Sequence, residues 1–408
     1  MHKLRTRKIL SLVLSLVLCF GLFSSVFAEE APELTQKILD NVYEPNFSIE
    51  LLEDGIKKVI DGDGRELYLV PREMETPAEL EDKIVIPCPV ENAVFLSSTQ
   101  TSVFQAVNDE ETIARVGGLN MDKDFWTFIP EFPKAMEEDK IKFIGAADGM
   151  GEPDYEAIQN LNPDVVFVYS GDYGQVNEIA KFEELGINYA VDNDYMEKDY
   201  MDRMEWIRFI LTFFDRDIEG KDIMLSAKTS MDRIFREIEA KEEPKVAYFN
   251  VWEGTYYPTA GDSWISNLIK DMGAVNVFDE ADVNNLTEEV AFELIQDADI
   301  IIYSSNMMYF DGLNGLKDAF PLLEECKAYQ NNKVFALGDD FWNGLVETDR
   351  LAKELAAVFY PELNEKFYVH IDTKVVEVAE EVVEELAEEV EEVAEEVEET
   401  EAEESKAA

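Results

Sequence analysis

Three short apolar runs in the second half of the chain decide the fold: Lys245–Asn250 (KVAYFN), Ile300–Ser304 (IIIYS) and Val334–Leu337 (VFAL). Each run predicts the strand of a strand–loop–helix unit. Unusual side chains stand in the segments that follow the runs. They are Trp252, Tyr256 and Tyr257 after the first, Met307, Met308 and Tyr309 after the second, and Asp339, Asp340 and Trp342 after the third.

The first half of the chain repeats this arrangement. Its runs are Ala93–Leu96 before Ser97 to Thr101, Lys142–Ile144 before Asp148 and Met150, and Val165–Tyr169 before Asp172 and Tyr173. In open α/β sheets the ligand crevice lies outside the carboxyl ends of the strands, because loops converge there on one edge. The sequence therefore predicts an α/β protein with two lobes and a ligand cleft between them.

The first residues predict export from the cytoplasm. A basic start at residues 3–8 precedes the apolar run Ile9–Phe23, and Val26-Phe27-Ala28 follow, with a small residue at the cleavage position. This is the three-part pattern of a secretory signal peptide, so we expect cleavage after Ala28. The apolar run is rather short for a membrane anchor. Lipid attachment at Cys19 is the alternative, although the residue before it is Leu where a small residue is expected.

Composition fits an exported two-domain protein. The 408 residues are 46% hydrophobic, which is enough for two cores. With 89 acidic and 35 basic residues the net charge is −54, which disfavours nucleic acid and anionic membranes as partners. Beyond the signal only Cys88 and Cys326 remain, too few for a disulfide scaffold, and we expect separate thiols in different lobes.

The C-terminal tail is a region of its own. From Val375 to Ala408 it holds sixteen Glu and one Lys. Apolar residues recur at spacings of three and four from Val375 to Val397, which would place one stripe along a helix. Like charges four residues apart weaken such a helix, and the composition favours a segment that is marginal or disordered alone. The role that this composition allows is association of the tail with itself or with a basic partner.

The segment before the first lobe predicts a hairpin. Val59–Pro71 forms two short apolar stretches around Asp61-Gly62-Asp63-Gly64. The turn lacks the spaced third carboxylate and the distal Glu of a calcium-binding loop. A plain hairpin is therefore the better interpretation.

Helical patterns separate and connect the predicted strands. Asp154–Asn160 begins with a capping Asp, Val176–Leu185 ends at Gly186, and Met201–Phe214 has an apolar face. The longest pattern runs from Gly220 to Lys241 without Pro or internal Gly, and predicts one long rigid helix joining the lobes. The expected organisation is a signal peptide at 1–28, a leader with a β-hairpin at 29–82, an N-terminal α/β lobe at 83–215, a linking helix at 216–243, a C-terminal α/β lobe at 244–370 and an acidic tail at 371–408.

Several motifs occur in a recognisable order and spacing. They are Asp61-Gly62-Asp63-Gly64-Arg65 with Val70-Pro71, Pro153–Ile158 with Asn162–Val166, Phe182–Ile187, Ala260–Ile265 with Gly273–Phe278, and Leu322–Val334. Together they resemble the helix-linked substrate-binding proteins of ABC importers, which serve cobalamin, ferric siderophores and haem. The resemblance spans roughly residues 59–362. Asp202–Ile207 resembles only a subgroup of these proteins, and Asn285–Asp299 is a looser match.

The resemblance implies a function and two docking residues. It implies a protein, not an enzyme and without a cofactor of its own, that captures a metal chelate and delivers it to an ABC transporter permease. The chelate would be a ferric siderophore, a corrinoid or haem. One surface Glu on each lobe docks on the permease in this family, and the matching residues here are Glu156 and Glu289.

Histidine usage excludes one related function. His2 lies in the signal peptide and His370 lies at the end of the second lobe. Importers of bare zinc or manganese bind the ion through several histidines, because imidazole suits those metals. A metal should therefore arrive inside an organic chelate, held by shape, stacking and hydrogen bonds.

The candidate ligand-binding residues come mainly from the predicted loops, and each could instead have a purely structural role. Aromatic residues near strand ends often belong to the core, and Arg203 either faces an anionic group of the ligand or pairs with Glu205 or Asp202 in solvent. The set is Trp126, Met150, Tyr169, Asp172, Tyr173, Arg203, Trp252, Tyr256, Tyr257, Met307 and Trp342.

Two other function classes are the alternatives. Chelatase- or nitrogenase-like enzymes also pair α/β lobes, but catalysis there needs a poised His, a metal cluster or paired carboxylates. The cysteines lack cluster spacing, and Asp148, Asp339 and Asp340 are weak evidence in so acidic a chain. The third class is a surface interaction protein that uses the acidic tail.

Overall fold

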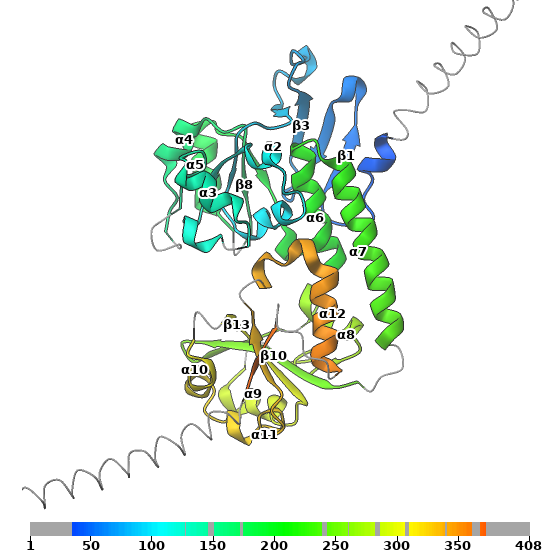
Figure 1. Cartoon of the computed structure of the whole chain (residues 1–408), viewed down its shortest axis with the longest axis vertical. Coiled ribbons are helices and arrows are strands. Elements are labelled where there is room, and N and C mark those ends of the chain that lie inside the picture. Colours follow the sequence, from blue (N-terminus) through cyan, green and yellow to red (C-terminus); the bar gives the residue numbers. More distant parts are fainter. Residues whose placement is uncertain are drawn as a thin grey trace, which may run out of the picture. The chain divides into compact units, whose positions relative to one another are not determined.

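The computed structural model divides the chain into two compact units, with two sheets in unit 1, one in unit 2, and helices in both (Figure 1). Unit 1 comprises Met1–Ser230 and Trp342–Thr348, and unit 2 comprises Met231–Phe341 and Asp349–Ala408. The described residues are 35–126, 128–145, 151–171, 174–238, 243–259, 261–281, 286–306, 310–338, 341–360 and 368–372. The predicted signal peptide and the tail beyond residue 372 lie outside them.

Unit 1 begins with a small four-stranded sheet. Its strands lie in the order β1-β2-β3-β4, with β3 and β4 parallel and the other pairs antiparallel. The predicted hairpin is confirmed, because Ile60 pairs with Glu66 across the turn. The bounds are β1 Ser48–Leu51, β2 Lys57–Ile60, β3 Glu66–Pro71 and β4 Ile84–Cys88.

The second sheet of unit 1 is parallel throughout, with the order β7-β6-β5-β8-β9. Its central strands are short and fully apolar, as expected of strands covered on both faces. The chain moves from β5 in one direction and returns to β8 on the other side, so a topological switch point lies between them. The bounds are β5 Ala93–Phe95, β6 Val116–Leu119, β7 Lys142–Phe143, β8 Val165–Val168 and β9 Tyr189–Val191.

The helices of unit 1 start and stop as their sequences direct. The Asp154 carboxylate accepts the Ala157 N–H at 2.8 Å at the start of α4, and Gly186 ends α5 with a φ of 67°, so both predicted caps are confirmed. Helix α6 is almost wholly buried. The bounds are α2 Glu110–Ile113, α3 Glu131–Glu137, α4 Tyr155–Leu161, α5 Val176–Leu185 and α6 Tyr200–Phe213, with short 3₁₀ helices η3 Thr99–Gln105 and η5 Asp194–Met196.

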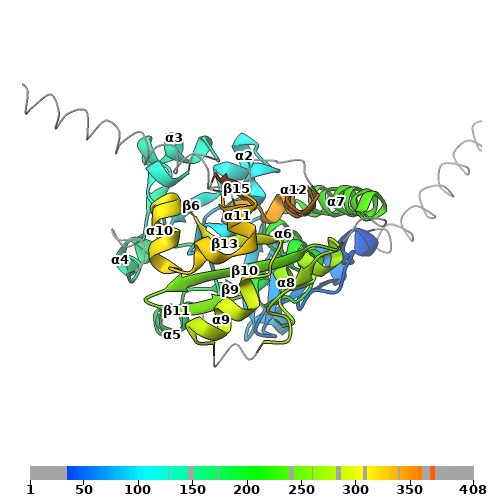
Figure 2. The same ribbon diagram turned by 90° about the horizontal axis from the view of Figure 1, so that it is seen from below.

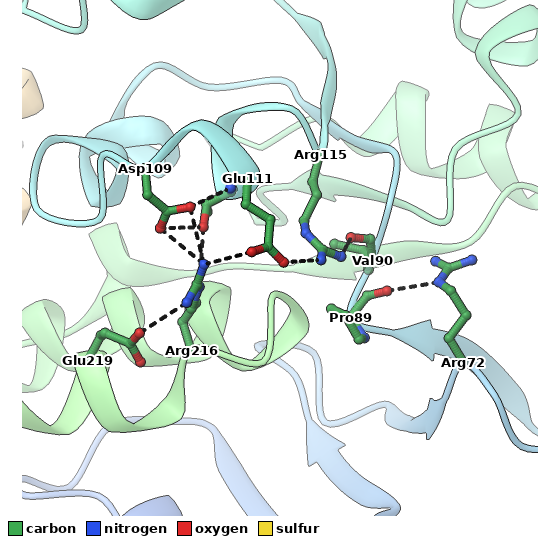
Figure 3. Close-up of polar contacts among 9 residues, drawn as sticks. Arg72, Pro89, Val90, Asp109, Glu111, Arg115, Arg216 and Glu219 are labelled. Carbon is green, nitrogen blue, oxygen red and sulfur yellow. Dashed lines mark hydrogen bonds and ion pairs between the residues drawn. The ribbon is translucent and has the colours of Figure 1, made fainter.

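The predicted long helix is present as α7, Asp217–Ile238, and the division into units falls within it, after Ser230. Ionic contacts fix its first turn to unit 1. The Lys57 ammonium lies 2.8 Å from Asp215 and also contacts Asp217. The Arg216 guanidinium reaches Asp109 at 3.1 Å (Figure 3). The corner between α6 and α7 is therefore held by β2 and α2.

Unit 2 contains a six-stranded mixed sheet. Strands β10, β13 and β14 are parallel, β11 and β15 are antiparallel edges, and β12 pairs with the start of β10. Helices α9, α10 and α11 share one apolar core with β10 and β13 (Figure 2). The bounds are β10 Lys245–Trp252, β11 Thr255–Pro258, β12 Val275–Asn276, β13 Ile300–Asn306, β14 Val334–Leu337, β15 Tyr368–Ile371, α8 Trp264–Asp271, α9 Glu288–Ile295, α10 Gly312–Ala319, α11 Lys327–Gln330 and α12 Thr348–Phe359.

One predicted unit is corrected by the structure. The run at Lys245 continues to Trp252 and turns back directly into β11, so it is followed by a hairpin where a loop and helix were expected. Glu253 and Gly254 have φ values of 50° and 76°, which provide the left-handed turn that a two-residue hairpin needs. The mixed sheets otherwise confirm the predicted α/β class.

Two further expectations can be compared with the described residues. Cys88 and Cys326 are both buried and free, one in each unit, as predicted. None of the helices in the described ranges combines the length and apolar character that crossing a bilayer requires.

Candidate ligand-binding site

The switch point of unit 1 brings two predicted loops together. The Ser97 hydroxyl, after β5, donates to the Tyr169 hydroxyl, after β8, at 3.2 Å. Burial raises the pKa of Tyr169 well above its usual value, so the phenol stays neutral. Of the predicted ligand-binding residues, Tyr169 therefore lies at the position where open α/β sheets have their ligand crevice.

Arg203 lies below these loops, where it forms an ion pair inside unit 1. Its side chain is 8% exposed, and its Nη2 lies 2.9 Å from Oδ2 of the buried Asp194. Burial raises the pKa of Asp194 and of the neighbouring buried Asp192. The expected solvent pairing of Arg203 with Glu205 or Asp202 is wrong. Sequence spacing missed the pair because Asp194 comes from a loop that only the fold brings under α6.

Two of the predicted aromatic residues are core residues. Trp126 is fully buried against Phe132, with ring centres 5.3 Å apart, and its indole N–H donates to the Met121 carbonyl at 3.1 Å. Tyr256 is 6% exposed and packs edge-on against Phe320. Neither ring is available at the surface for stacking, which corrects their prediction as ligand contacts.

The other two aromatic residues of the hairpin are exposed. Trp252 is 64% and Tyr257 is 51% exposed. Side chains alternate along strands, and Asn250 pairs with Tyr257 across the hairpin, so Asn250, Trp252 and Tyr257 share one face. The Oδ1 atom of Asn250 is buried and has no hydrogen-bond partner among the described residues. Two rings and one unsatisfied acceptor on the same face form a surface suited to a flat, partly polar ligand.

The remaining candidates keep the status of predictions. Trp342 lies in the short helix Phe341–Asn343. Met150, Asp172, Tyr173 and Met307 lie outside the described residues, as do Asp148, Met308, Tyr309, Asp339 and Asp340. The cleft expected between the lobes is likewise a prediction.

The two predicted docking residues occupy equivalent places in their units. Glu156 is exposed in the first turn of α4, and Glu289 is exposed in the first turn of α9. Thr287 caps α9 by accepting the Val290 N–H at 3.4 Å. Hydrogen bonds from its own backbone N–H and from Thr287 hold the pKa of Glu289 below its usual value. Helix α4 starts beside the carboxyl end of β7, because the Asp154 N–H donates to the Ile144 carbonyl at 2.8 Å.

Two cavities lie at the opposite edges of the sheets. One of about 640 Å³ in unit 2 is lined by Lys245 and Val275, which begin β10 and β12. The other, of about 600 Å³ in unit 1, is lined by Val116 and Ile141 near the starts of β6 and β7. The described residues that line them include no aromatic ring. None of the predicted ligand-binding residues is among the described residues that line these two cavities, and the site at the carboxyl-edge loops stays a prediction.

The described residues hold no group of three or more His, Cys, Asp or Glu arranged to bind a metal ion. His370 makes a structural contact, because its Nε2 lies 2.9 Å from the Asn332 carbonyl oxygen.

Residues 94–341, more than half of the chain, match the Periplasmic binding protein family. The chain belongs to this family. The match confirms the resemblance seen in the sequence motifs. An uncharacterized lipoprotein of Methanocaldococcus jannaschii is 28% identical in an alignment of 327 positions that covers 75% of this chain and 75% of the relative. A second uncharacterized lipoprotein of that organism is 25% identical and covers 71% and 74%.

Solved periplasmic binding proteins share the fold. The heme-binding protein HutB of Vibrio cholerae has a TM-score of 0.52 at 17% identity, covering 66% of this chain and 99% of that one. A periplasmic binding protein from Veillonella parvula has a TM-score of 0.54 at 15% identity, covering 79% and 100%. A periplasmic heme-binding protein from Pseudomonas aeruginosa has a TM-score of 0.54 at 13% identity, covering 69% and 98%. At these identities the likeness concerns the fold.

Proposed function

We propose that this periplasmic binding protein is the extracytoplasmic substrate-binding component of an ABC importer, and that it captures a metal chelate and passes it to the permease. Family membership and the fold shared with heme-binding proteins support this function. The ligand class is a ferric siderophore, a corrinoid or haem. No chemical step is assigned to the protein.

The observation that carries the proposal is the exposed aromatic face of the β10–β11 hairpin. Trp252 and Tyr257 are held by a paired strand and are largely exposed. Large exposed aromatic side chains on an ordered strand are characteristic of recognition surfaces, because their rings stack on flat ligands. Asn250 adds an acceptor that a ligand donor group would satisfy. A chelate ring with polar edge groups matches both features.

Location outside the cytoplasm is part of the proposal. The family is periplasmic, and two relatives are named as lipoproteins. A basic start and an apolar run precede the described residues. Whether the chain is released or lipid-anchored is decided by the processing of its N-terminus.

The test combines ligand identification with titration. Native mass spectrometry of gently purified protein should find a chelate-sized adduct. Haem, cobalamin and ferric siderophores are then titrated in turn while tryptophan fluorescence is followed. N-acetyl-tryptophanamide serves as a control for light absorption by the chelates. One class should quench the protein saturably and beyond this control, and absence of saturable quenching by all three classes would reject the proposed ligand class.

A further inference from the structure

We infer that the β2–β3 turn, Asp61–Arg65, braces the ligand-side loop that begins at Tyr169, and that Asp63 is a positioning residue for ligand binding. The inference rests on the proposed function. The turn carries the Asp61-Gly62-Asp63-Gly64 motif, which does not match a calcium-binding loop. The four-stranded sheet needs a turn at this place but does not need these particular residues.

The turn is bonded to the carboxyl end of β9. The Asp61 carboxylate is fully buried and accepts the N–H groups of Arg65 at 2.9 Å and Val191 at 3.2 Å. The Gly62 N–H donates in return to the Val191 carbonyl at 2.9 Å. One carboxylate therefore closes the turn and ties it to the neighbouring sheet.

Two close approaches tighten this junction. The Arg65 guanidinium lies 3.6 Å from the centre of the Tyr189 ring and donates to the Tyr189 carbonyl at 3.2 Å. A Cβ atom on Gly62 would lie 2.9 Å from the side-chain nitrogen of Asn193. Glycine at this position thus lets the turn backbone lie directly on the segment after β9.

From the turn, hydrogen bonds reach Ser170. Its hydroxyl donates to Asp63 Oδ1 at 2.5 Å and accepts from Asn193 Nδ2 at 2.8 Å. Its N–H donates to Asn193 Oδ1 at 3.0 Å, and its carbonyl accepts from the Tyr195 hydroxyl. Every polar group of this 9%-exposed residue is satisfied. Asp63 is the one partner that comes from the turn.

Ser170 is adjacent to Tyr169, and Gln175, further along the same loop, holds the backbone of Tyr169. The Tyr169 N–H donates to the Gln175 side-chain oxygen at 2.5 Å, and the Gln175 N–H donates to the Tyr169 carbonyl at 2.9 Å. Gly171 follows with a φ of 77°, and a Cβ there would lie 2.7 Å from the Tyr195 hydroxyl. The backbone that presents Tyr169 at the switch point is thus fixed on both sides.

This arrangement assigns Asp63 a role without ligand contact. A loop held in its binding conformation loses less conformational freedom when ligand binds, so a brace increases affinity through pre-organisation. Removing the brace should release the loop while the rest of unit 1 stays folded. Asp63 is exposed, so its loss leaves no buried charge behind.

The experiment is a double-mutant cycle with Asp63→Ala and Ser170→Ala. Hydrogen exchange is measured at the amides of Tyr169, Ser170 and Gln175 without ligand, and affinity for the quenching chelate is measured by titration. Each single variant should speed exchange and weaken binding about three- to tenfold, as expected for one hydrogen bond to a charged group. The double variant should match Ser170→Ala, because that variant already lacks the bond to Asp63 and also loses the bond from Asn193 Nδ2 to the hydroxyl. Asp63→Asn keeps an acceptor oxygen and should restore most of the protection.

Asp82→Ala, an exposed aspartate between η2 (Ala78–Leu80) and β4, is the matched control and should change neither readout. Faster exchange with unchanged affinity would overturn the positioning role. Unchanged exchange in Asp63→Ala would overturn the brace itself, whatever the ligand result. If wild-type protein binds no chelate, the proposed function fails, and faster exchange in the variants would still support the brace.

Discussion

Arg203 and Asp194 form a buried ion pair, with 2.9 Å between Nη2 and Oδ2, beneath the loops at the carboxyl edge of unit 1. Breaking a buried pair by removing one partner leaves an uncompensated charge, which costs about 3–5 kcal/mol. We expect Arg203→Ala to lower the free energy of unfolding by about this amount in urea denaturation at pH 7. Arg236→Ala, at an exposed position on α7, should change it by less than about 0.5 kcal/mol. Unchanged stability together with lost affinity for an anionic chelate would instead place Arg203 in direct contact with the ligand.

Helix α6 also uses its polar residues to hold the N-terminal segment. Arg208 donates to the carbonyl oxygens of Ile38 at 2.6 Å and Leu39 at 2.8 Å. Glu205 accepts the Tyr43 N–H at 2.9 Å, and Asp202 accepts the N–H of Glu44 at 2.7 Å. The motif around Asp202–Ile207, which resembles only a subgroup of the family, therefore binds a segment of its own chain.

Burial gives Asp202 a measurable pH dependence. Burial raises its pKa from 3.8 to about 6, and the nearby carboxylates of Asp199 and Glu197 act in the same direction. A carboxyl group with a raised pKa in the folded state stabilises it when protonated. That stabilisation is fully present below about pH 4 and is lost as pH rises through about 6.

We expect Asp202→Asn to flatten the pH dependence of unfolding between pH 4 and 6. Because Asp202 is partly exposed and screened by solvent, the difference should be about 1 kcal/mol or less. Urea denaturation of both proteins at pH 4, 5, 6 and 7 measures it. A wild-type slope that persists in Asp202→Asn would assign the pH dependence to other groups.

The hairpin aromatics should separate into binding and stability residues. Trp252→Ala and Tyr257→Ala should weaken binding of the quenching chelate by about 1–3 kcal/mol if the rings stack, with little effect on unfolding. Tyr256→Ala removes a core ring and should lower the free energy of unfolding by about 3–5 kcal/mol. Chelate titration and urea denaturation of all three variants distinguish these effects. Equal affinity in wild type, Trp252→Ala and Tyr257→Ala would remove the hairpin from the site.

Local chemistry explains which elements could be predicted. The strands at Val165, Tyr189 and Val334 are short apolar runs, and the caps at Asp154 and Gly186 depend on adjacent residues only. Such features are encoded within a few positions of the chain. They placed the parallel sheet of unit 1 and the mixed sheet of unit 2, with the loops at their carboxyl edges.

Side-chain environment could not be predicted in the same way. Trp126 and Trp252 are both aromatic residues near a strand or turn, yet one is fully buried and the other largely exposed. The difference comes from packing partners and from the hairpin, whose turn uses Glu253 where Asn or Asp is the usual indicator. The turn glycine Gly254 followed by the β-favouring residues Thr255, Tyr256 and Tyr257 was the available evidence for β11. The contact from Asp63 to Ser170 joins residues 107 positions apart, and no local pattern reveals it.

N-terminal processing can be settled by mass. We expect intact-mass measurement of exported protein to place Glu29 at the amino terminus, because the small residues before it match a signal-peptidase site. The lipoprotein relatives make Cys19 the alternative position. A mature chain that begins at Cys19 with a mass increase of acyl chains would show lipid anchoring and overturn cleavage after Ala28.

Handover to the permease is the remaining step of the proposed function. In the family that the motifs resemble, one surface Glu on each lobe docks on the permease, and Glu156 and Glu289 are the matching residues. Both are exposed in the first turns of capped helices. Acidic residues in a first helical turn are favoured locally by the helix dipole, and the chain has 89 acidic residues, so position alone is weak evidence. Function must therefore be tested by charge reversal.

We expect Glu156→Arg with Glu289→Arg to abolish chelate uptake while leaving chelate affinity unchanged. Charges at an interface rim govern encounter and orientation, whereas the ligand surface sets affinity. Glu110→Arg is the matched control, because Glu110 is likewise exposed in the first turn of a helix capped by an aspartate, Asp109. Uptake by cells carrying each variant, with titration of the purified proteins, measures both properties. Normal uptake by the double variant would reject these two residues as docking sites, and an equal loss in Glu110→Arg would show that net charge, not position, controls delivery.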